Sequence, residues 1–455
     1  LASLLSRDLY GVEPHHKAPL PMDTRPRQPH FAPRAKAVIQ FCMQGGPSQV
    51  DLFDPKPALE KFHGADAPEE FTKVAPAGRS MKGKVMRSHW KFARHGQSGA
   101  WVSELLPHTA KMIDEIAIIR SMYNVHENHE PACYKWQSGE IFPGHPTLGA
   151  WVTYGLGSVS QNLPAYVVLA DPQNPLPVNN VENWMSGYLP PLYQGTRIKS
   201  EGTPMLHIKP DYQEPAGITA AKRNLINALD RLHKSKRPNQ PVLDSRIANY
   251  QMAARMQVEA SEALDVSSET EATRELYGVG AKDTDNFGKR CLMARRLVER
   301  GVRFVQIYPR GQMWDNHSNI KTSLPAACRQ SDKPCAALLR DLRQRGLLDD
   351  VLVLWGGEFG RLPMAQGDYA KAGRDHGPSG FTSWMAGGGV KGGVVHGETD
   401  EIGYGAVRNR VSIQDWHATI LHQLGMDHEK LTVDRNGLEE RLTHTYPTRV
   451  VREIL

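Results

Sequence analysis

Short apolar runs recur along the chain, each bounded by polar or glycine-rich residues. The clearest runs are residues 37–43, 116–119, 165–169, 304–308 and 351–355. A run that is apolar at nearly every position is typical of a parallel strand covered by helices on both faces. We therefore predict that these segments are buried strands of one mainly parallel sheet.

Helical spacing appears between these runs. Apolar residues recur at intervals of three and four from Asp332 to Arg345, and again after Asp415, and each stretch ends at a glycine. This alternation of strand and helix predicts a doubly wound α/β fold. Residues 215–300 keep the helical spacing with almost no strand signal. We predict that they form a helical insertion contributing few residues to a functional site.

The first 36 residues have a different character. Residues 11–36 are rich in Pro, His, Arg and Lys and show no apolar period, so we predict an extended arm over residues 1–36 and an α/β domain over 37–455. Residues 1–5 are apolar and small, which is typical of the tail of an export signal. The alternative is an ordinary trimmed terminus, and we expect export.

Composition narrows the class of protein. The chain is 40% hydrophobic and 23% charged, which suits a globular protein rather than a disordered one. It contains no run of 18 apolar residues, so we expect no membrane span. The net charge of +6 is small and its cations are scattered, which argues against nucleic acid as a partner. Nothing in the pattern indicates an oligomeric state.

Side chains able to bind metals or anions gather after two of the predicted strands. Ligands bind beyond the carboxyl ends of parallel strands, so these positions are where a site is expected. The residues that follow the strands at 304–308 and 351–355 are Asp315, His317, Glu358, Arg361, Arg374, Asp375 and His376. Oxygen and nitrogen donors suit zinc, manganese, magnesium or calcium better than soft metals. A lone histidine in a glycine-rich loop is more often a surface residue, but several clusters in one region favour a metal site.

Two other strand ends add candidates. The first strand is followed by Gly45, Gly46 and then Asp51, which either faces the site or belongs to a plain turn. After the strand at 116–119 comes a segment rich in His and Glu that contains His129. His129 is a candidate ligand, general acid or nucleophile.

Several common enzyme motifs are absent. The glycine-rich stretch at 387–393 lacks the Gly-Lys-Ser/Thr of a P-loop, no GxSxG elbow occurs, and no GxGxxG follows a strand. These absences argue against a P-loop nucleotide enzyme, a serine esterase and a dinucleotide-dependent enzyme. The five cysteines are odd in number and contain no CxxC pair, which argues against a disulfide framework and a cysteine-based zinc cluster.

A set of motifs spread over nearly the whole chain points to one family. They are Gly45-Gly46-Pro47-Ser48, Asp51-Leu52-Phe53-Asp54-Pro55-Lys56-Pro57, Asn128-His129-Glu130-Pro131-Ala132, Trp314-Asp315-Asn316-His317, Trp355-Gly356-Gly357-Glu358-Phe359-Gly360-Arg361 and Gly373-Arg374-Asp375-His376. With these the chain resembles a bacterial family, domain of unknown function fifteen-oh-one, often labelled sulfatase-like. Members commonly begin with a twin-arginine export signal, which implies a periplasmic location.

That family is similar to the alkaline phosphatase and sulfatase superfamily, whose members hydrolyse phosphate or sulfate esters, or move phosphate, at a metal site. The resemblance implies a sheet of that type. In the superfamily pattern the strand ending at Trp355 carries an Asp-His pair, where this chain has Glu358 and Phe359. Glu358 can bind a metal and Phe359 cannot. The resemblance therefore implies one metal, held by Asp315, His317 and His376 with Glu358 beside it.

The sulfatase nucleophile is missing from this pattern. Sulfatases place a Cys-x-Pro-Ser-Arg motif ten residues before a glycine, and counting back from Gly139 leads to His129 instead of a cysteine. Catalysis by formylglycine is therefore not supported. Thr147 is the nearest hydroxyl candidate for a nucleophile.

Two functions from different classes fit these observations. The first is a metal-dependent hydrolase of sulfate or phosphate esters, acting on an anionic ester such as a sulfated polysaccharide, with Arg361 or Arg374 holding the anionic group. The second is a non-catalytic exported binding protein that retains the fold. A structural alternative for the site itself is that Glu358 pairs with Arg361 or Arg374 and that the histidines only bind loop backbone.

Overall fold

The computed structural model describes residues 21–72, 83–171, 177–200, 215, 217–237 and 240–455. The proposed signal remnant, and with it the first 20 residues of the predicted arm, lie outside the described residues. Residues 21–36 contain no helix or strand. Their backbone follows the body of the protein, because the N–H groups of Arg27 and Phe31 donate to the carbonyls of Leu156 and Gly425.

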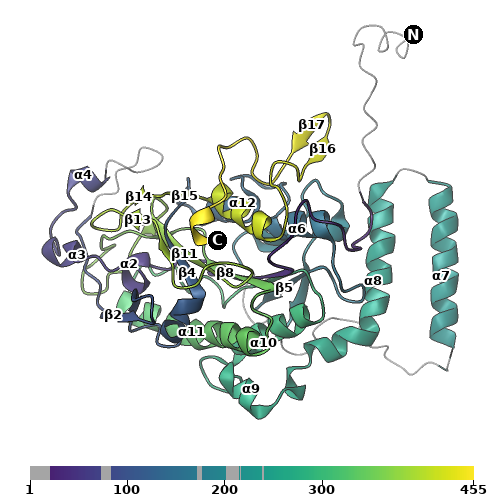
Figure 1. The fold of residues 1–455 in the computed structure, drawn as a ribbon, viewed down its shortest axis with the longest axis horizontal. Coiled ribbons are helices and arrows are strands. Elements are labelled where there is room, and N and C mark those ends of the chain that lie inside the picture. The colour runs from purple at the N-terminus through teal and green to yellow at the C-terminus, as the bar shows by residue number, and fades with distance from the viewer. Residues whose placement is uncertain (1–20, 73–82, 172–176, 201–214, 216, 238–239) are drawn as a thin grey trace, which may run out of the picture.

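A nine-stranded sheet forms the centre of the molecule (Figure 1). Its strands are β1 (Ala37–Cys42), β4 (Ile116–Tyr123), β5 (Tyr166–Ala170), β6 (Thr196–Lys199), β7 (Phe304–Ile307), β8 (Val351–Gly356), β11 (Phe381–Ala386), β12 (Val395–His396) and β15 (Val411–Ser412). The order is β12-β4-β11-β8-β1-β7-β5-β6, and β15 also pairs with β4. Within this sheet β11 pairs antiparallel with β4 and β8, and the other pairs are parallel. All the predicted strands are present, which confirms a mainly parallel sheet.

Helices cover both faces of the sheet. One face packs on α10 (Asp285–Glu299) and α11 (Ile320–Gln344), whose buried side chains share a core with alternate residues of β1. The opposite face packs on α5 (His129–Ser138), α6 (Leu148–Leu156) and α12 (Ile413–Gln423), which share a second core with the intervening residues of β1. Two apolar faces on one sheet account for the continuous apolar runs in its strands, and the doubly wound arrangement is confirmed.

Helix α11 is longer than the sequence predicted. It begins at Ile320 instead of Asp332 and continues through Pro325 and Pro334. An internal proline removes a backbone hydrogen bond, which is why the pattern suggested a later start. Here Ile320 and Leu324 are fully buried in the core, and this packing holds the first turns in place despite the prolines.

The segment at 215–300 is helical in its described part, as predicted. It contains α7 (Ile218–Ser235), α8 (Pro241–Leu264), α9 (Glu271–Leu276) and α10. Helix α10 contacts β1, β5 and β7 and so belongs to the layer that covers the sheet. Helix α7 lies at the edge of the molecule, with α8 between it and the rest of the protein (Figure 1).

The remaining elements are short. They are the α-helices α2 (Gln49–Leu52), α3 (Ala58–Lys61) and α4 (Glu69–Thr72), the 3-10 helices η2 (Thr109–Glu115), η3 (Asn180–Trp184), η4 (Pro191–Tyr193), η5 (Val266–Ser268) and η6 (Arg452–Ile454), and the strands β2 (Phe92–His95), β3 (Ala100–Ser103), β9 (Gly360–Arg361), β10 (His376–Gly377), β13 (Glu398–Thr399), β14 (Ala406–Arg408), β16 (Val433–Arg435) and β17 (Leu438–Glu440). The five cysteines are free and buried. Among the described helices none is long and apolar enough to cross a bilayer.

Candidate metal centre

The candidate site lies at the carboxyl ends of neighbouring strands. Gly45 follows β1, Asp315 and His317 follow β7, and Glu358 lies two residues beyond the end of β8. His129 opens α5 shortly after β4. Because β7, β1 and β8 are adjacent and parallel, their carboxyl ends bring residues from three distant parts of the sequence to one edge.

Four side chains converge at this edge. One donor atom from each of His129, Asp315, His317 and His376 can be chosen so that all lie within 4.8 Å of one another. Asp315 Oδ1 lies 2.8 Å from His317 Nε2 and 3.3 Å from Nε2 of both His129 and His376. The Nε2 atoms of His317 and His376 are 2.9 Å apart. The convergence of Asp315, His317 and His376 expected from the sequence is observed, and His129 joins them.

Each imidazole turns its other nitrogen toward a hydrogen-bond acceptor. His129 Nδ1 lies 2.6 Å from Glu358 Oε1, and His376 Nδ1 lies 2.6 Å from the carbonyl oxygen of Glu127. His317 Nδ1 contacts the side-chain oxygen of Gln366. An acceptor at Nδ1 places the proton there, so each neutral ring presents the lone pair of Nε2 to the centre of the cluster.

Acceptors therefore face acceptors at the centre. Three lone pairs and a carboxylate oxygen meet there, and His129 Nε2 is buried without a hydrogen-bond partner. Such a set is unfavourable unless a positive charge lies among its members. Metal-binding histidines commonly have this arrangement, with the outer nitrogen bound to a carboxylate or a carbonyl. The residues present therefore fit a divalent cation.

Charge at the cluster shifts the pKa values of its members. Burial works against ionisation of Asp315, but hydrogen bonds that the three histidines can donate through Nε2 when no metal is bound, and the charge of Arg361, outweigh it and hold the pKa well below its usual range. Burial alone would lower the pKa of His129, yet Asp315 and Glu358 raise it to about 9. In the absence of metal, a proton on His129 supplies the positive charge. A metal must displace that proton to bind.

Glu358 supports the cluster from behind His129. Its side chain is 1% exposed, and Oε1 accepts from the backbone N–H of Gly45 at 2.9 Å as well as from His129. A carboxylate in this place fixes the orientation of the imidazole and makes it more basic. Gly45 permits the contact, because its φ is +108° and a Cβ there would lie 2.4 Å from the backbone nitrogen of Asp315.

Arg361 is turned toward the protein. Its guanidinium donates to Asp315 Oδ1, to the carbonyl of Gly46 at 3.1 Å and to the carbonyl of Arg374 at 3.0 Å, and it also donates to the carbonyl of Gly45. The side chain is 1% exposed. Arg361 therefore balances the charge of Asp315 and joins the loops after β1 and β8, and most of its donors are already used.

Asp51 and Arg374 form a buried ion pair. Nε and Nη2 of Arg374 lie 2.7 and 3.1 Å from the two carboxylate oxygens of Asp51, and both side chains are 0% exposed. Ser48 Oγ also donates to Asp51 at 2.6 Å. The structure thus places the expected ligand and the expected anion-binding arginine against each other, because a buried guanidinium requires a carboxylate partner.

Of the two remaining candidates, Asp375 lies beside the four-residue cluster and Thr147 lies apart from it. Asp375 Oδ1 accepts the backbone N–H of His376 at 2.8 Å and lies 3.7 Å from His317 Nδ1. Thr147 is a buried N-cap residue of α6 whose hydroxyl donates to the carbonyl of Met185 at 3.2 Å. Roles for Asp375 in metal binding and for Thr147 in catalysis stay predictions.

Phe359 forms an apolar wall of the site. Its ring centroid lies 4.5 Å from that of His376, with 29° between the ring planes, and 4.9 Å from that of His129. The ring restrains two ligand imidazoles, and it supplies no donor atom.

Sequence reasoning missed the groups that bind the outer nitrogens. Gln366 and the carbonyl of Glu127 fix the tautomers of His317 and His376, yet neither belongs to a metal-binding motif. The carbonyl of Glu127 has no signal in the side-chain pattern. Gly45 was the one visible sign of a close approach, since paired glycines after a strand often permit one.

Comparison with solved structures finds distant similarity to a sulfatase, a lipoteichoic acid synthase and an alkaline phosphatase. The chain is similar to the PsFucS1 sulfatase from Pseudoalteromonas sp., at 11% identity over 87% of this chain and 69% of that chain, with a TM-score of 0.38. It is also similar to the lipoteichoic acid synthase LtaP from Listeria monocytogenes (9% identity, 93% and 79% covered, TM-score 0.36). A third is the alkaline phosphatase of the Antarctic bacterium TAB5 (11% identity, 81% and 96% covered, TM-score 0.31).

Comparison with protein families identifies the family of the chain. No curated protein matches the sequence. A family model covers nearly the whole chain, from residue 35 to residue 455. It includes every residue of the cluster and all nine strands of the sheet. The chain therefore belongs to the family described as "Protein of unknown function (DUF1501)".

Proposed function

We propose that this protein is a metal-dependent hydrolase of anionic esters, either sulfate or phosphate esters. One observation carries the proposal. The Nε2 atoms of three histidines and a carboxylate oxygen of Asp315 meet at one point, while the outer nitrogens of the histidines are held by acceptors. This arrangement positions donor atoms for a cation before the cation binds.

The donor set favours particular metals. Three imidazole nitrogens and one carboxylate suit zinc, and also manganese, better than magnesium or calcium, which prefer oxygen ligands. When bound, a divalent cation there would polarise an ester oxygen and favour ionisation of a water molecule. The side chains of His317 and Asp315 are 35% and 22% exposed, against 15% for His129 and 13% for His376. We propose that substrate approaches on the side of His317.

The residues of the cluster have separate roles in holding the metal. His129, His317 and His376 bind through Nε2, Asp315 adds a negative charge, and Glu358 keeps His129 in the correct tautomer. Cys133, close in sequence to His129, is buried, and burial raises the pKa of its thiol well above the ordinary value. A thiol of this kind is a poor nucleophile. We propose water as the nucleophile.

The second candidate function is a non-catalytic exported binding protein. The engagement of Arg361 and Arg374 by other protein groups favours it, because an ester hydrolase benefits from a free arginine beside the anionic group. This protein would hold a metal and an anionic ligand, such as a sulfated polysaccharide, without cleaving it.

Export to the periplasm is part of both proposals. It rests on the apolar, small residues at 1–5 and on the family resemblance described above. Fractionation of cells that express the full-length precursor would test it. Recovery of the protein in the cytoplasm alone would contradict export without bearing on the metal site.

The decisive experiment combines metal analysis with two assays. Purified protein is loaded with zinc or manganese, freed of excess metal, analysed for bound metal and assayed on an aryl sulfate and an aryl phosphate. His317→Ala should lose metal and activity together. His233→Ala, at an exposed histidine of α7, is the matched control and should retain both.

The outcomes separate the two candidates. Bound metal with activity on either ester supports the hydrolase. Bound metal without activity on either ester supports the binding protein. Failure of the parent to bind zinc or manganese would contradict both.

A further inference from the structure

Helix α7 presents its apolar side to solvent. The side chains of Leu225, Ile226, Leu229 and Leu232 are 54–61% exposed, and the helix has no buried residue. Ile226, Leu229 and Leu232 lie one, four and seven positions after Leu225, and this spacing places the four side chains on one stripe of the helix. A contiguous exposed stripe of large apolar side chains on a folded protein commonly marks a binding surface.

The opposite side of α7 faces the protein and is polar. The least exposed residues of the helix are Arg223, Asn227 and Asp230, which are half-buried and spaced by four and three. Asn227 Oδ1 accepts from Gln251 of α8 at 3.3 Å. The pair of Lys234 Nζ and an oxygen of Asp244, at 2.7 Å, adds a second polar contact with α8. Helix α7 is thus turned away from the usual orientation, in which the apolar stripe packs on the protein.

The charge of this segment is strongly positive. Residues 218–237 contain six Lys or Arg and one Asp, whereas the whole chain has 55 basic and 49 acidic residues. Most of the formal net charge of +6 therefore lies in this one segment. A second copy of the same helix would bring like charges together, so charge argues against pairing of two α7 helices. An anionic surface would attract the segment.

We propose that α7 binds the surface of a membrane that contains anionic lipid. A basic helix with a narrow apolar stripe lies in the plane of such a surface, with its leucines among the upper acyl chains and its cations near the headgroups. The position of α7 at the edge of the molecule, beyond α8 (Figure 1), leaves its apolar stripe accessible. The interaction is peripheral and independent of the metal centre.

Vesicle co-sedimentation of the full chain tests this proposal. The parent should bind vesicles of phosphatidylglycerol and phosphatidylcholine in equal parts, and binding should weaken as salt is added. Leu225→Ser/Leu229→Ser should weaken binding by about tenfold or more, because each leucine loses its burial in the acyl region. Leu438→Ser is the matched control, since Leu438 is a 68% exposed leucine of β17, and it should bind as the parent does.

Three results would overturn the proposal. One is an absence of binding to the mixed vesicles. Another is equal binding to vesicles of phosphatidylcholine alone, which would remove the role of charge. The third is a concentration-dependent dimer in solution that Leu225→Ser/Leu229→Ser abolishes, which would show that a second copy covers the stripe. Circular dichroism of each variant confirms that the fold is intact.

Discussion

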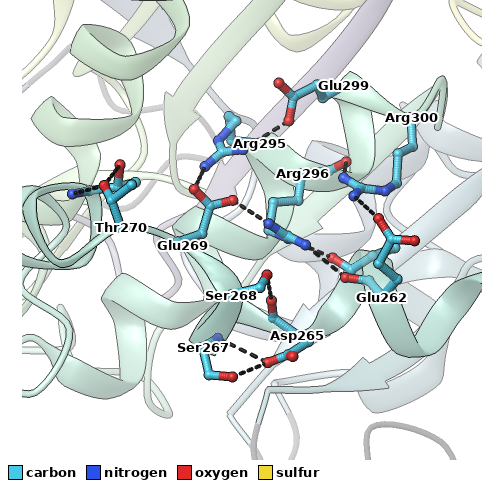
Figure 2. A network of polar contacts seen from close by, with 12 residues as sticks. Glu262, Asp265, Ser267, Ser268, Glu269, Thr270, Arg295, Arg296, Glu299 and Arg300 are labelled. Carbon is cyan, nitrogen blue, oxygen red and sulfur yellow. Dashed lines mark hydrogen bonds and ion pairs between the residues drawn. The ribbon is translucent and has the colours of Figure 1, made fainter.

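Two groups of charged residues in this protein differ in how their charges are balanced. At the candidate metal centre, the carboxylate of Asp315 is surrounded by three imidazoles and one guanidinium. The second group consists of Glu269, which follows η5, and of residues on α10 and α11, and its carboxylates pair with arginine. Figure 2 shows Glu269 between the guanidinium groups of Arg295 and Arg296.

The second group is complete as a structural network. Arg295, 1% exposed, lies 2.8 Å from Glu269, 2.8 Å from Glu299 and 2.9 Å from Asp341. Asp341 also accepts from Tyr277 at 2.9 Å. These contacts raise the pKa of Arg295 and lower the pKa of Glu269, despite the opposing effect of burial on both. Permanent charges of opposite sign satisfy one another here.

The metal centre lacks that internal balance. Its bases are imidazoles, which carry no permanent charge, and a neutral imidazole offers the lone pair of Nε2 to Asp315 instead of a proton. A network of permanent ion pairs stabilises the fold, whereas a cluster of lone pairs and one carboxylate binds a cation. The predictions below test this difference.

The largest expected effect is on stability in the arginine network. Arg295→Met removes the buried cation shared by Glu269, Glu299 and Asp341, which keep only the more exposed Arg345 in common. The change should lower the free energy of unfolding by about 3–5 kcal/mol. Thermal and urea unfolding would measure it. Arg300→Met is the control, because the pair of Arg300 with Glu262 is solvent-exposed and is expected to contribute less than about 1 kcal/mol. Equal effects of the two changes would contradict the account of the network.

The next effect is on metal binding at the centre. Asp315→Asn removes the only carboxylate among the four donors and should weaken zinc binding by at least about 100-fold. Competition with a chromophoric chelator would measure the affinity. Retention of parental affinity would exclude Asp315 as a ligand. Arg295→Met, at a temperature where it is folded, should bind zinc as the parent does.

A change at Glu358 tests whether its carboxylate supports metal binding by His129. Glu358→Gln keeps the shape of the side chain but removes its charge, so His129 becomes less basic and is oriented less firmly. Zinc affinity should fall by about 10- to 100-fold. The matched change Glu269→Gln, in the arginine network, should reduce stability and leave zinc affinity unchanged. Weaker zinc binding in Glu269→Gln, together with unchanged zinc binding in Glu358→Gln, would reverse the assignment of the two groups.

The pKa of His129 gives a prediction about pH. In metal-free protein this pKa is raised to about 9, so the stabilisation from protonated His129 is fully present below its ordinary pKa near 6.5 and is lost as pH rises through 9. Metal binding has the opposite dependence, because the metal displaces the proton. Between pH 6.5 and 9, zinc affinity should rise about tenfold per unit. A flat profile in the parent would contradict the proposed competition.

The smallest effect is expected at Asp375. Its carboxylate is directed to the backbone N–H of His376 and lies on the outer-nitrogen side of His317. Asp375→Asn should change zinc affinity by less than about threefold, which is less than the loss typical of a supporting group. A loss as large as that for Asp315→Asn would make Asp375 a ligand, as the sequence suggested.

The sequence predicted the sheet and the place of the site well. The strands at 37–43, 304–308 and 351–355 carry a continuous apolar pattern, and the rule that ligands follow parallel strands then located Asp315 and His317. Two helical features were not predicted. The start of α11 was obscured by Pro325, and the inverted orientation of α7 depends on contacts that its own pattern does not contain.

The contacts between side chains were harder to predict from the sequence than the sheet. Residues far apart in sequence, such as Asp51 and Arg374, both looked like site residues, since a charged residue in a glycine-rich loop has the same pattern whether it binds a ligand or another side chain. The difference arises from burial and direction, which three-dimensional packing decides. The direction of Glu358 toward His129 likewise depends on the approach of Gly45 to the loop after β7.

The central claim is that one metal ion binds among four donor atoms. The most direct test is an anomalous difference map from crystals of the parent grown with zinc. The account predicts one strong peak about 2.0–2.2 Å from Nε2 of His129, His317 and His376 and from an oxygen of Asp315. A map with no peak there, or with zinc bound by a different set of residues, would contradict it.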